Sequence, residues 1–345
     1  MKPSPSPLAN TLVVIPTYNE EKYIEQCIRS LIEGCDEHTI IAVADGMSED
    51  RTVEIVEQLQ EEFSNLELIH NAKRLQSAAV NLAAEQYSHF ESGYMVRCDA
   101  HSIYPENFVR DIVMCLEREG AASVVIPMDA VGQTCFEKSN AWIVDTPFGS
   151  GGAAHRGGKV SGYIDHGHHA GFDLQWFRKL GGYDETFSHN EDAEYDHRVI
   201  ASGGAIFLDA QTRIGYVPRG STLALIRQYF NYGKGRARTC IKHNKKLKIR
   251  QLLPIILVLG LMMSSLGGFI HLALLAPLFL YAFLLIGISI YMSALKRSVC
   301  GLWSCVILAS MHLGWGTGFL VQILQTRFFG MQNIFSNTTH RSSTN

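Results

Sequence analysis

The sequence predicts an α/β domain with a mostly parallel sheet and flanking helices, followed by a C-terminal transmembrane helical anchor. Strand-like and helix-like patterns alternate along residues 11–127, and the stretches 252–295 and 298–326 contain no Asp, Glu, Lys or Arg. Alternating strands and helices with short connections favour a parallel sheet covered on both faces. A membrane-spanning helix needs about 20 apolar residues, and the uncharged stretches provide room for three.

The expected strands are short runs rich in β-branched residues, and the expected helices repeat apolar residues every three to four positions. The strands are Thr11–Ile15, Ile40–Ala44, Leu66–Ile69, Tyr94–Cys98 and Ala122–Pro127. The helices are Glu21–Glu33, Thr52–Glu62, Gln76–His89 and Pro105–Glu119. Asn19 is expected to cap the first helix. In such sheets ligands bind beyond the carboxyl ends of the strands, so the residues that follow each strand are the candidates for chemistry.

Three spans follow, at Leu252–Ile270, Leu272–Met292 and Val299–Leu320. Basic residues precede the first span and lie between the second and third, and none lies between the first and second. The positive-inside rule then places residues 1–250 in the cytoplasm and the C-terminus outside. The first ten residues lack the apolar core of a signal peptide and are expected to form a flexible arm. The alternative is a set of buried helices in a soluble core.

Composition excludes several classes of protein. The chain has 345 residues, of which 47% are hydrophobic and 18% charged, with a formal net charge of −3. It therefore has enough apolar material for a core and is not a globally basic nucleic-acid binder. Eight cysteines without a CxxC pair are too few for a disulfide scaffold, so reduced thiols are expected.

Polar and acidic residues follow three of the expected strands. PTYNEE begins at Pro16, DGMSED at Asp45 and DAH at Asp99. Such residues suit a sugar, a base edge, or a divalent cation that in turn holds phosphates. No GxxxxGK[ST] motif is present and no GxGxxG follows the first strand. These absences argue against a P-loop kinase and an ordinary dinucleotide-dependent oxidoreductase.

An ordered set of motifs carries a family resemblance over about residues 11–242. VVIPTYNEEKYIEQCIRSL, ADGMSEDRT, RLQSAAVNLA, CDAH, GGYDETFSHNEDAEYDHRV and QYFNYGKGRART occur in that order. Together they resemble the family 2 glycosyltransferases, and the wording DAH, IDHGHHAGF and NEDAE is most similar to the succinoglycan-biosynthesis type of membrane glucosyltransferase. The resemblance implies the GT-A fold, a Rossmann-like sheet that binds a nucleotide sugar.

The resemblance also implies site residues. Those expected to bind the donor nucleotide are Pro16, Thr17, Tyr18, Glu20, Asp45, Arg74, Gln76 and Asp99. The catalytic base is expected at Asp192, with Glu191 beside it. A carboxylate near a helix start is also a common N-cap, which is the structural alternative for this pair.

The family usually has Asp-x-Asp where this chain has Asp99 and His101. Alternation in an extended segment puts these two side chains on the same side, and both are expected at a divalent metal. The metal is Mn²⁺ or Mg²⁺, and an imidazole ligand favours Mn²⁺. His101 either binds the metal or contacts phosphate directly.

Two further segments are acceptor or phosphate-binding candidates. His168 and His169 belong to a His-Gly-His-His run, for which zinc is the alternative, although neither cysteine nor HExxH accompanies it. Gln228 and Arg236 lie in a segment that departs from the QxxRW of processive synthases, because the Trp is absent. Its basic residues also suit anionic lipid headgroups.

Residues and resemblance together predict an inverting, metal-dependent hexosyltransferase of bacterial exopolysaccharide biosynthesis. UDP-glucose is the expected donor, and a polyprenyl-diphosphate-linked saccharide is the expected acceptor. The protein is expected to be multi-pass in the bacterial cytoplasmic membrane, with the bilayer and no nucleic acid as a partner. A processive polysaccharide synthase and a non-catalytic membrane scaffold are the alternatives, and a dehydrogenase is a more distant one.

The expected organisation has five parts. A flexible arm occupies 1–10, a cytoplasmic catalytic domain 11–220, a basic interfacial segment 221–250, three transmembrane helices 251–325 and a short polar tail 326–345.

Overall fold

The computed structural model describes residues 8, 10–90, 93–102, 104–151 and 158–329. Most of the predicted arm at 1–10 and of the polar tail at 326–345 lies outside these residues. The chain forms two compact units, one of Met1–Asp129 with Ala154–Tyr216 and one of Ala130–Ala153 with Val217–Asn345. The first unit is therefore interrupted in sequence, because residues 130–153 pack with the C-terminal helices. The functional division into catalytic domain, interfacial segment and anchor stays a prediction.

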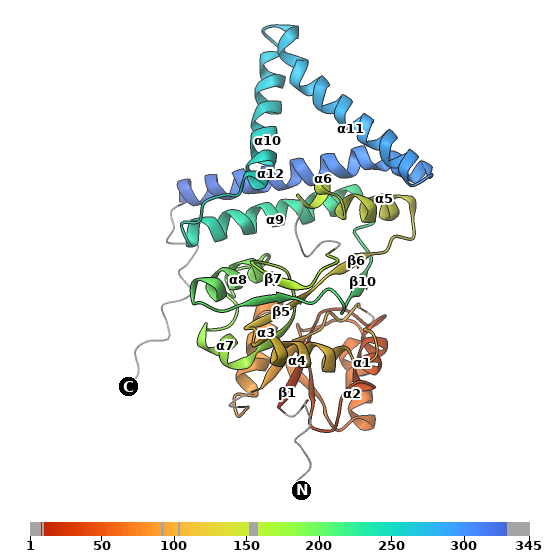
Figure 1. Ribbon diagram of the computed structural model, residues 1–345, viewed down its shortest axis with the longest axis vertical. Coiled ribbons are helices and arrows are strands. Elements are labelled where there is room, and N and C mark those ends of the chain that lie inside the picture. The colour runs from red at the N-terminus through yellow and green to blue at the C-terminus, as the bar shows by residue number, and fades with distance from the viewer. Residues whose placement is uncertain (1–7, 9, 91–92, 103, 152–157, 330–345) are drawn as a thin grey trace. The chain divides into compact units, whose positions relative to one another are not determined.

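The first unit is built on an eight-stranded sheet (Figure 1). Its strands in chain order are β1 Thr11–Thr17, β2 Ile40–Asp45, β3 Leu66–His70, β4 Tyr94–Arg97, β5 Ser123–Ile126, β7 Gly162–Ile164, β8 His168–Asp173 and β9 Ile206–Leu208. Their spatial order is β3-β2-β1-β4-β8-β5-β9-β7. Strands β3, β2, β1 and β4 are parallel, as are β5 and β9, whereas β8 runs antiparallel to both of its neighbours. The predicted mostly parallel sheet is confirmed.

Two hydrophobic clusters cover opposite faces of this sheet. Val13 and Ile15 belong to the cluster with helices α1 Ile24–Ile32, α2 Thr52–Glu62 and α4 Phe108–Glu119. Leu12 and Val14 belong to the cluster with helices α3 Gln76–Gln86, α7 Leu174–Lys179 and α8 Glu191–Ala201. Successive side chains of a strand point to opposite faces, so an uninterrupted apolar strand supplies both clusters.

Two expected helix starts are displaced. Helix α4 begins at Phe108 and not at Pro105, because Asn107 has a left-handed backbone with φ 64° that interrupts the helical conformation. Helix α1 begins at Ile24, after Tyr23, so Asn19 does not cap it and that prediction is wrong. A separate two-stranded sheet pairs β6 Met128–Ala130 with β10 Ile214–Tyr216.

The second unit is helical. It contains α5 Cys135–Val144, α6 Pro147–Ser150, α9 Thr222–Lys242, α10 Ile249–Gly267, η1 Leu272–Leu275, α11 Ala276–Leu295, η2 Val299–Trp303 and α12 Ser304–Phe329. The segments Ile249–Gly267, Leu272–Leu295 and Val299–Phe328 are long and apolar enough to cross a membrane. Each overlaps one predicted span.

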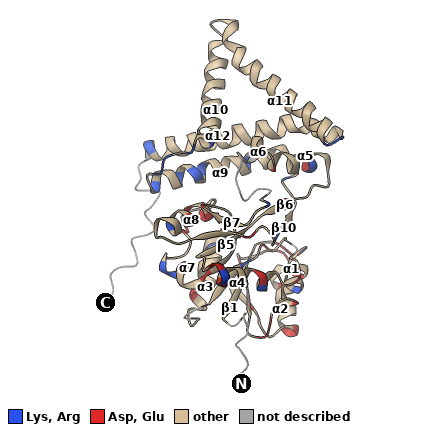
Figure 2. Ribbon diagram, viewed as in Figure 1, with Lys and Arg blue, Asp and Glu red and all other residues tan. Residues whose placement is uncertain are grey.

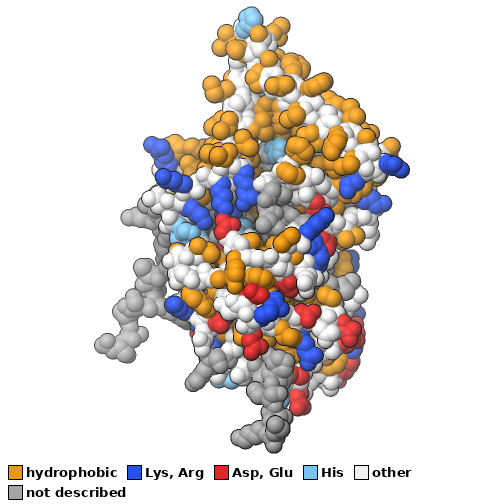
Figure 3. All heavy atoms as spheres, viewed as in Figure 1, with side chains coloured by type: hydrophobic (Ala, Val, Ile, Leu, Met, Phe, Trp, Pro, Cys, Tyr) orange, Lys and Arg blue, Asp and Glu red, His pale blue; other side chains and the backbone are white. Residues whose placement is uncertain are grey.

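The three apolar segments differ in how far they are buried. In each of the first two segments, 17% of the most apolar 18-residue stretch is buried against other parts of the protein. In the third segment this share is 50%. Helices α10 and α11 form a hairpin without basic or acidic residues between its ends, and its surface is almost continuously apolar (Figures 2 and 3). An exposed apolar surface of this extent is typical of helices that lie in a hydrocarbon environment. Helix α12 instead lies along α9, which contains several basic residues (Figures 1 and 2).

Glycines allow α9 and α12 to approach closely. A Cβ atom added at Gly318 would lie 2.0 Å from the carbonyl oxygen of Phe230, and one added at Gly233 would lie 2.0 Å from that of Trp315. Gly314, one turn before Gly318, meets the carbonyl oxygen of Ile226 in the same way, at 2.9 Å. A small-xxx-small pattern lets two backbones pack directly and is common between membrane helices.

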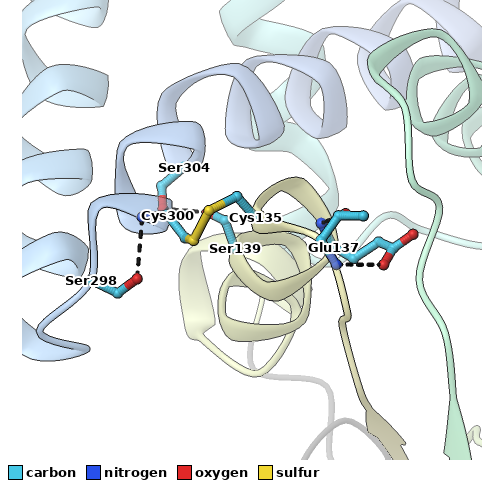
Figure 4. The surroundings of a disulfide bond; sticks show 7 residues. Cys135, Glu137, Ser139, Ser298, Cys300 and Ser304 are labelled. Atoms are coloured by element: carbon cyan, nitrogen blue, oxygen red, sulfur yellow. Dashed lines mark hydrogen bonds between the residues drawn. A yellow bond between two sulfur atoms is a disulfide. The ribbon is translucent and has the colours of Figure 1, made fainter.

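A disulfide joins Cys135 at the start of α5 to Cys300 in η2 (Figure 4). Helix α5 packs on η2, which brings residues 165 positions apart in sequence to a Cα separation of 4.7 Å. The Ser139 and Ser304 hydroxyls lie 3.0 Å apart at the same contact. The expectation that all cysteines are reduced is therefore wrong for this pair, whose proximity no local pattern reveals.

The glycine contact predicts a stability difference between two matched variants. Gly318→Ala places a methyl group against the Phe230 backbone and should destabilise the protein by about 1–3 kcal/mol, as overpacking does. Gly287→Ala in α11 meets nothing within 4 Å and should be neutral or stabilising, because Ala forms helix about 1 kcal/mol better than Gly. Thermal unfolding in detergent measures both. Equal midpoints for the two variants would contradict the close helix contact.

Candidate active site

The loops that follow β1 and β2 are joined through Asn19. Its side-chain oxygen accepts the Glu49 backbone N–H at 2.8 Å, and its own N–H donates to the Ser48 hydroxyl at 2.9 Å. Asn19 has φ 55°, a left-handed conformation that Asn tolerates better than most residues. Asn19 therefore connects the two predicted nucleotide-binding loops.

Asp45 ends β2 and is almost fully buried. One carboxylate oxygen accepts the Ser48 backbone N–H at 3.0 Å, and the other accepts the Ser48 hydroxyl at 2.5 Å. Two of the other predicted nucleotide-binding residues lie in β1: Pro16 pairs in register with Ala44, and the buried Thr17 hydroxyl donates to the Ile15 carbonyl at 3.0 Å. These contacts hold the ends of β1 and β2, from which the two loops leave the sheet.

Tyr18 and Arg74 form the exposed side of the same region. The Arg74 guanidinium lies over the Tyr18 ring, 5.9 Å from its centroid, and 3.7 Å from a Glu49 carboxylate oxygen. Arg74 has φ 55° and directly precedes the start of α3, whose N-terminus can receive an anion. The predicted donor-binding residues Tyr18 and Arg74 are thus brought together.

Three side chains converge on Asp99, just beyond β4. The Gln76 amide donates to Oδ1 at 3.2 Å, the Arg97 guanidinium lies 3.5 Å from the same oxygen, and His168 Nε2 lies 3.6 Å from Oδ2. Burial raises the pKa of Asp99, but the charges of Arg97, His168 and His101 outweigh it, so the pKa lies below its usual value. His168 reaches Asp99 because β8 runs antiparallel and begins at the sheet edge where β4 ends.

His101 faces Glu20: its Nδ1 lies 3.1 Å from Glu20 Oε1. Among the described residues, no group of three His, Cys, Asp or Glu side chains is placed to hold a metal. The carboxylate of Asp99 suits a divalent cation, but the chain supplies only part of a coordination sphere. Such partial sites are common where substrate phosphates provide the remaining ligands.

Asp192 and Glu191 begin α8. The N-cap position of this helix is Asn190, so Asp192 does not occupy it, although Asp192 Oδ1 accepts the Ala193 backbone N–H at 2.7 Å. Burial raises the pKa of Asp192, but the charges of His166 and Arg97 lower it below its usual value. Burial and the charge of Asp192 raise the pKa of Glu191. The two adjacent carboxyl groups thus differ in acidity, and Asp192 is the more acidic of the two.

A buried cluster lies behind these carboxylates. Asp196 on α8 contacts His166 Nδ1 and His169 Nε2 at 2.7 Å each, one with each carboxylate oxygen. The histidines proposed for zinc in the alternative interpretation are therefore bonded to a carboxylate. Sequence analysis missed Asp196 and Arg97. Both had a signal, because Asp196 follows Asp192 by one helical turn and Arg97 shares a strand face with Asp99.

Arg198 holds the turn at residues 180–182, which directly precedes Tyr183. It donates to the carbonyls of Leu180 at 2.5 Å and Gly182 at 2.7 Å, and its Nε lies 3.0 Å from the fully buried Glu194 carboxylate. Gly182 has φ 67°, which favours glycine. Asn81 completes the turn, since it both donates to the Tyr183 carbonyl and accepts its N–H, each at 2.8 Å.

The predicted site residues fall into three groups. Asp99, Gln76 and His168 are in contact, and Arg97 lies near enough to Asp192 to lower its pKa. Asp45 lies at the same sheet edge, but β1 separates β2 from β4. Gln228 and Arg236 belong to α9 in the second unit, where the Gln228 amide donates to the Tyr232 hydroxyl at 3.1 Å.

Comparisons with known proteins identify relatives of this chain. Residues 12–181 match the family model "Glycosyl transferase family 2". Over 319 residues the chain is 36% identical to the succinoglycan biosynthesis protein ExoA of Rhizobium meliloti (strain 1021), covering 92% of this chain and 96% of that protein. It is 24% identical over 234 residues to a dolichyl N-acetyl-alpha-D-glucosaminyl phosphate glucuronosyltransferase of Methanococcus voltae, covering 65% of this chain and 72% of that protein.

A solved structure supports the fold. The mannosyltransferase PcManGT from Pyrobaculum calidifontis, in complex with GDP-Man and Mn²⁺, superposes with a TM-score of 0.56 at 18% identity. The match covers 92% of this chain and 89% of that one. The GT-A fold that the motifs imply is thus confirmed.

The contacts of Arg198 predict a stability loss from a substitution that keeps the charge. Arg198→Lys cannot hold both carbonyls and Glu194 at once and should destabilise the protein by about 2 kcal/mol, the scale of lost hydrogen bonds to a charged group. Arg118→Lys, which affects an exposed pair with Glu119, should leave the midpoint unchanged. Chemical denaturation reports both values. An unchanged midpoint for Arg198→Lys would show that the turn does not depend on the guanidinium.

Proposed function

We propose that this chain, which belongs to glycosyltransferase family 2, is an inverting glycosyltransferase that moves a hexosyl unit from a nucleotide sugar to a lipid-linked saccharide. The observation that carries the proposal is that Asp99 and Asp192, from separate elements, are both held ionised near one buried arginine, Arg97. A donor-binding carboxylate and a base are the two acidic groups that this transfer needs.

The donor side of the proposal uses the strand exits. The nucleoside would lie over the Tyr18 and Asp45 loops, and Arg74 with the N-terminus of α3 would receive the diphosphate. A divalent cation, Mn²⁺ or Mg²⁺, would be held by Asp99, with His101 as a second protein ligand, and when bound it neutralises charge on the departing nucleoside diphosphate. UDP-glucose is the donor that we propose.

On the acceptor side, Asp192 is the proposed base. Its lowered pKa keeps it ionised at neutral pH, so its carboxylate can accept the proton of an acceptor hydroxyl that attacks the anomeric carbon. Attack from the face opposite the leaving group inverts the configuration of that carbon. Glu191, whose pKa is raised, is the weaker acid of the two and is less suited to the role of the base.

We propose His168 as the acceptor- or phosphate-binding histidine. Its side chain is partly exposed beside Asp99, whereas the His169 ring is fully buried and both of its nitrogens have partners. His169 therefore has no free atom to offer an acceptor. Gln228 and Arg236 on α9 are proposed to meet the phosphates of the lipid carrier.

The acceptor proposed is a polyprenyl-diphosphate-linked saccharide of bacterial exopolysaccharide biosynthesis. The name of the R. meliloti relative and the apolar surface of α10 and α11 both support it. Insertion of these helices in the cytoplasmic membrane, with the first unit on the cytoplasmic side, would confine the enzyme to the plane of its lipid substrate and raise the effective concentration of that substrate.

A donor panel with a matched variant tests this function. Wild-type protein in detergent with a lipid-linked saccharide should transfer sugar from one nucleotide sugar, most actively with Mn²⁺ or Mg²⁺. Asp192→Asn keeps the shape of the side chain but loses the base, so transfer should fall by about 10²–10⁴-fold while donor binding persists. Full turnover by Asp192→Asn would show that another group is the base, whereas a wild-type protein without turnover on any donor would favour the non-catalytic scaffold. NMR of the product's anomeric proton reports inversion.

The lowered pKa of Asp192 predicts the acid limb of the pH profile. The active ionised form is lost only as pH falls through the depressed pKa, so kcat/KM should stay flat from about pH 7 to about pH 5, with the limb below the usual Asp value of about 3.9. If Glu191 were the base, its raised pKa would move the limb above the usual Glu value of about 4.3. Return to pH 7 before assay controls for irreversible inactivation.

A further inference from the structure

We propose that Tyr183 is a positioning residue, which holds Arg97 and through it Asp99 in the orientation that receives the donor diphosphate. The proposal rests on the function proposed above, since it assigns Asp99 to the donor. Tyr183 follows the turn that Arg198 fixes and lies in the interior of the first unit, where it is 2% exposed. Its hydroxyl contacts Arg97 and His169 and is shielded from solvent, so any effect on the donor must pass through these neighbours.

Tyr183 is part of a continuous network of side-chain contacts that runs from Asp196 to Asp99. Asp196 Oδ1 lies 2.7 Å from His169 Nε2, His169 Nδ1 lies 2.7 Å from the Tyr183 hydroxyl, and an Arg97 N–H donates to that hydroxyl at 3.4 Å. The second terminal nitrogen of Arg97 then lies 3.5 Å from Asp99 Oδ1. Four contacts therefore connect a carboxylate on α8 with the carboxylate that follows β4.

The donors and acceptors of this chain permit one consistent assignment of protons. Arg97 can only donate, so the Tyr183 oxygen accepts from it. Burial raises the pKa of Tyr183 well above its usual value, so the phenol keeps its proton, and His169 Nδ1 is the remaining partner that can accept it. His169 then carries hydrogen on Nε2 and donates to the Asp196 carboxylate. The network thereby assigns the tautomer of His169 and the direction of the Tyr183 O–H.

Asp196, the last residue of this hydrogen-bond network, is itself held in place. The other oxygen of Asp196 contacts His166 Nδ1 at 2.7 Å and accepts the Gly167 backbone N–H at 3.3 Å. Asp196 and His169 are each 1% exposed, and Arg97 is 8% exposed. With no competing water at these groups, each hydrogen bond fixes the rotamer of the next side chain. The orientation of Tyr183 is therefore set by α8, the helix that also carries Asp192.

A second tyrosine shows that burial alone does not produce this arrangement. Tyr195 lies in the same aromatic cluster, with its ring 5.6 Å from the ring of His169 and 5.5 Å from that of Tyr183. It is also fully buried, but its hydroxyl has no hydrogen-bond partner within the described part of the chain. The two residues are matched in size and surroundings, and only the Tyr183 hydroxyl joins His169 to Arg97.

The test compares Tyr183→Phe with Tyr195→Phe in the full-length protein in detergent. Equilibrium binding of UDP is measured by calorimetry without acceptor, so turnover does not enter, and thermal unfolding is recorded for each variant. Loss of the Tyr183 hydroxyl should free Arg97 and weaken UDP binding by about 10-fold, the lower end of the effect of partners that orient ligand-binding groups. Tyr195→Phe should bind UDP as the wild type does.

Every other outcome overturns the proposal. Equal UDP affinity of Tyr183→Phe and wild type would show that Asp99 is held without the hydroxyl. Failure of Tyr183→Phe to fold, or an equal loss of affinity in Tyr195→Phe, would make the role structural. A wild-type protein that binds none of UDP, GDP and ADP would instead contradict the proposed function itself, and with it the assignment of Asp99 to a donor.

Discussion

The contact between Arg97 and Asp99 constrains the first unit more than any other. A charge in the interior of a protein is stable only when it is paired and hydrogen-bonded, and Arg97 is buried at the end of a central strand. Burial lowers the pKa of Arg97, but Tyr183, Asp99 and Glu191 raise it by more. Its partners come from the β4 exit, the turn before Tyr183 and the start of α8. The need to neutralise one guanidinium thus brings together three segments that are distant in sequence.

The half of the sheet formed by β1–β4 could be predicted because its signals are local. Each strand is a short apolar run, each helix repeats at helical spacing, and polar residues mark each exit. The same logic singled out Asp45 and Asp99 as candidates, whereas Asp192 was expected from the family resemblance alone. This logic failed for β8, because it considered only the residues that follow the carboxyl ends of parallel strands. Strand β8 is antiparallel to β4, so its first residue, His168, lies at the same edge of the sheet. Arg97 lies within the expected strand Tyr94–Cys98, and the strand pattern gives no indication that its charge has a role in the site.

Contacts between distant segments were beyond the reach of local patterns. Nothing near Cys135 or Cys300 indicates that α5 packs on η2, and the bond follows from that packing. The pairing of α9 with α12 is an intermediate case. Gly314 and Gly318 form a recognisable small-xxx-small pattern within an apolar span, yet the pattern does not name the partner, which is the polar segment containing Phe230 and Gly233. A span that packs along such a segment is half covered by protein, whereas α10 and α11 are not.

The position of Arg97 also bears on how the proposed transfer balances its charges. Before the reaction the excess negative charge lies on Asp192, and afterwards Asp192 has taken the acceptor proton while the departing nucleoside diphosphate has gained charge near Asp99. Arg97 lowers the pKa of both carboxyl groups, so it interacts with both ends of this movement. A cation held between the two sites by fixed partners can stabilise the charge at either end without reorganising. Tyr183, His169 and Asp196 would then contribute to the reaction as well as to stability. They would hold the Arg97 guanidinium in one position while negative charge shifts from Asp192 to the nucleoside diphosphate.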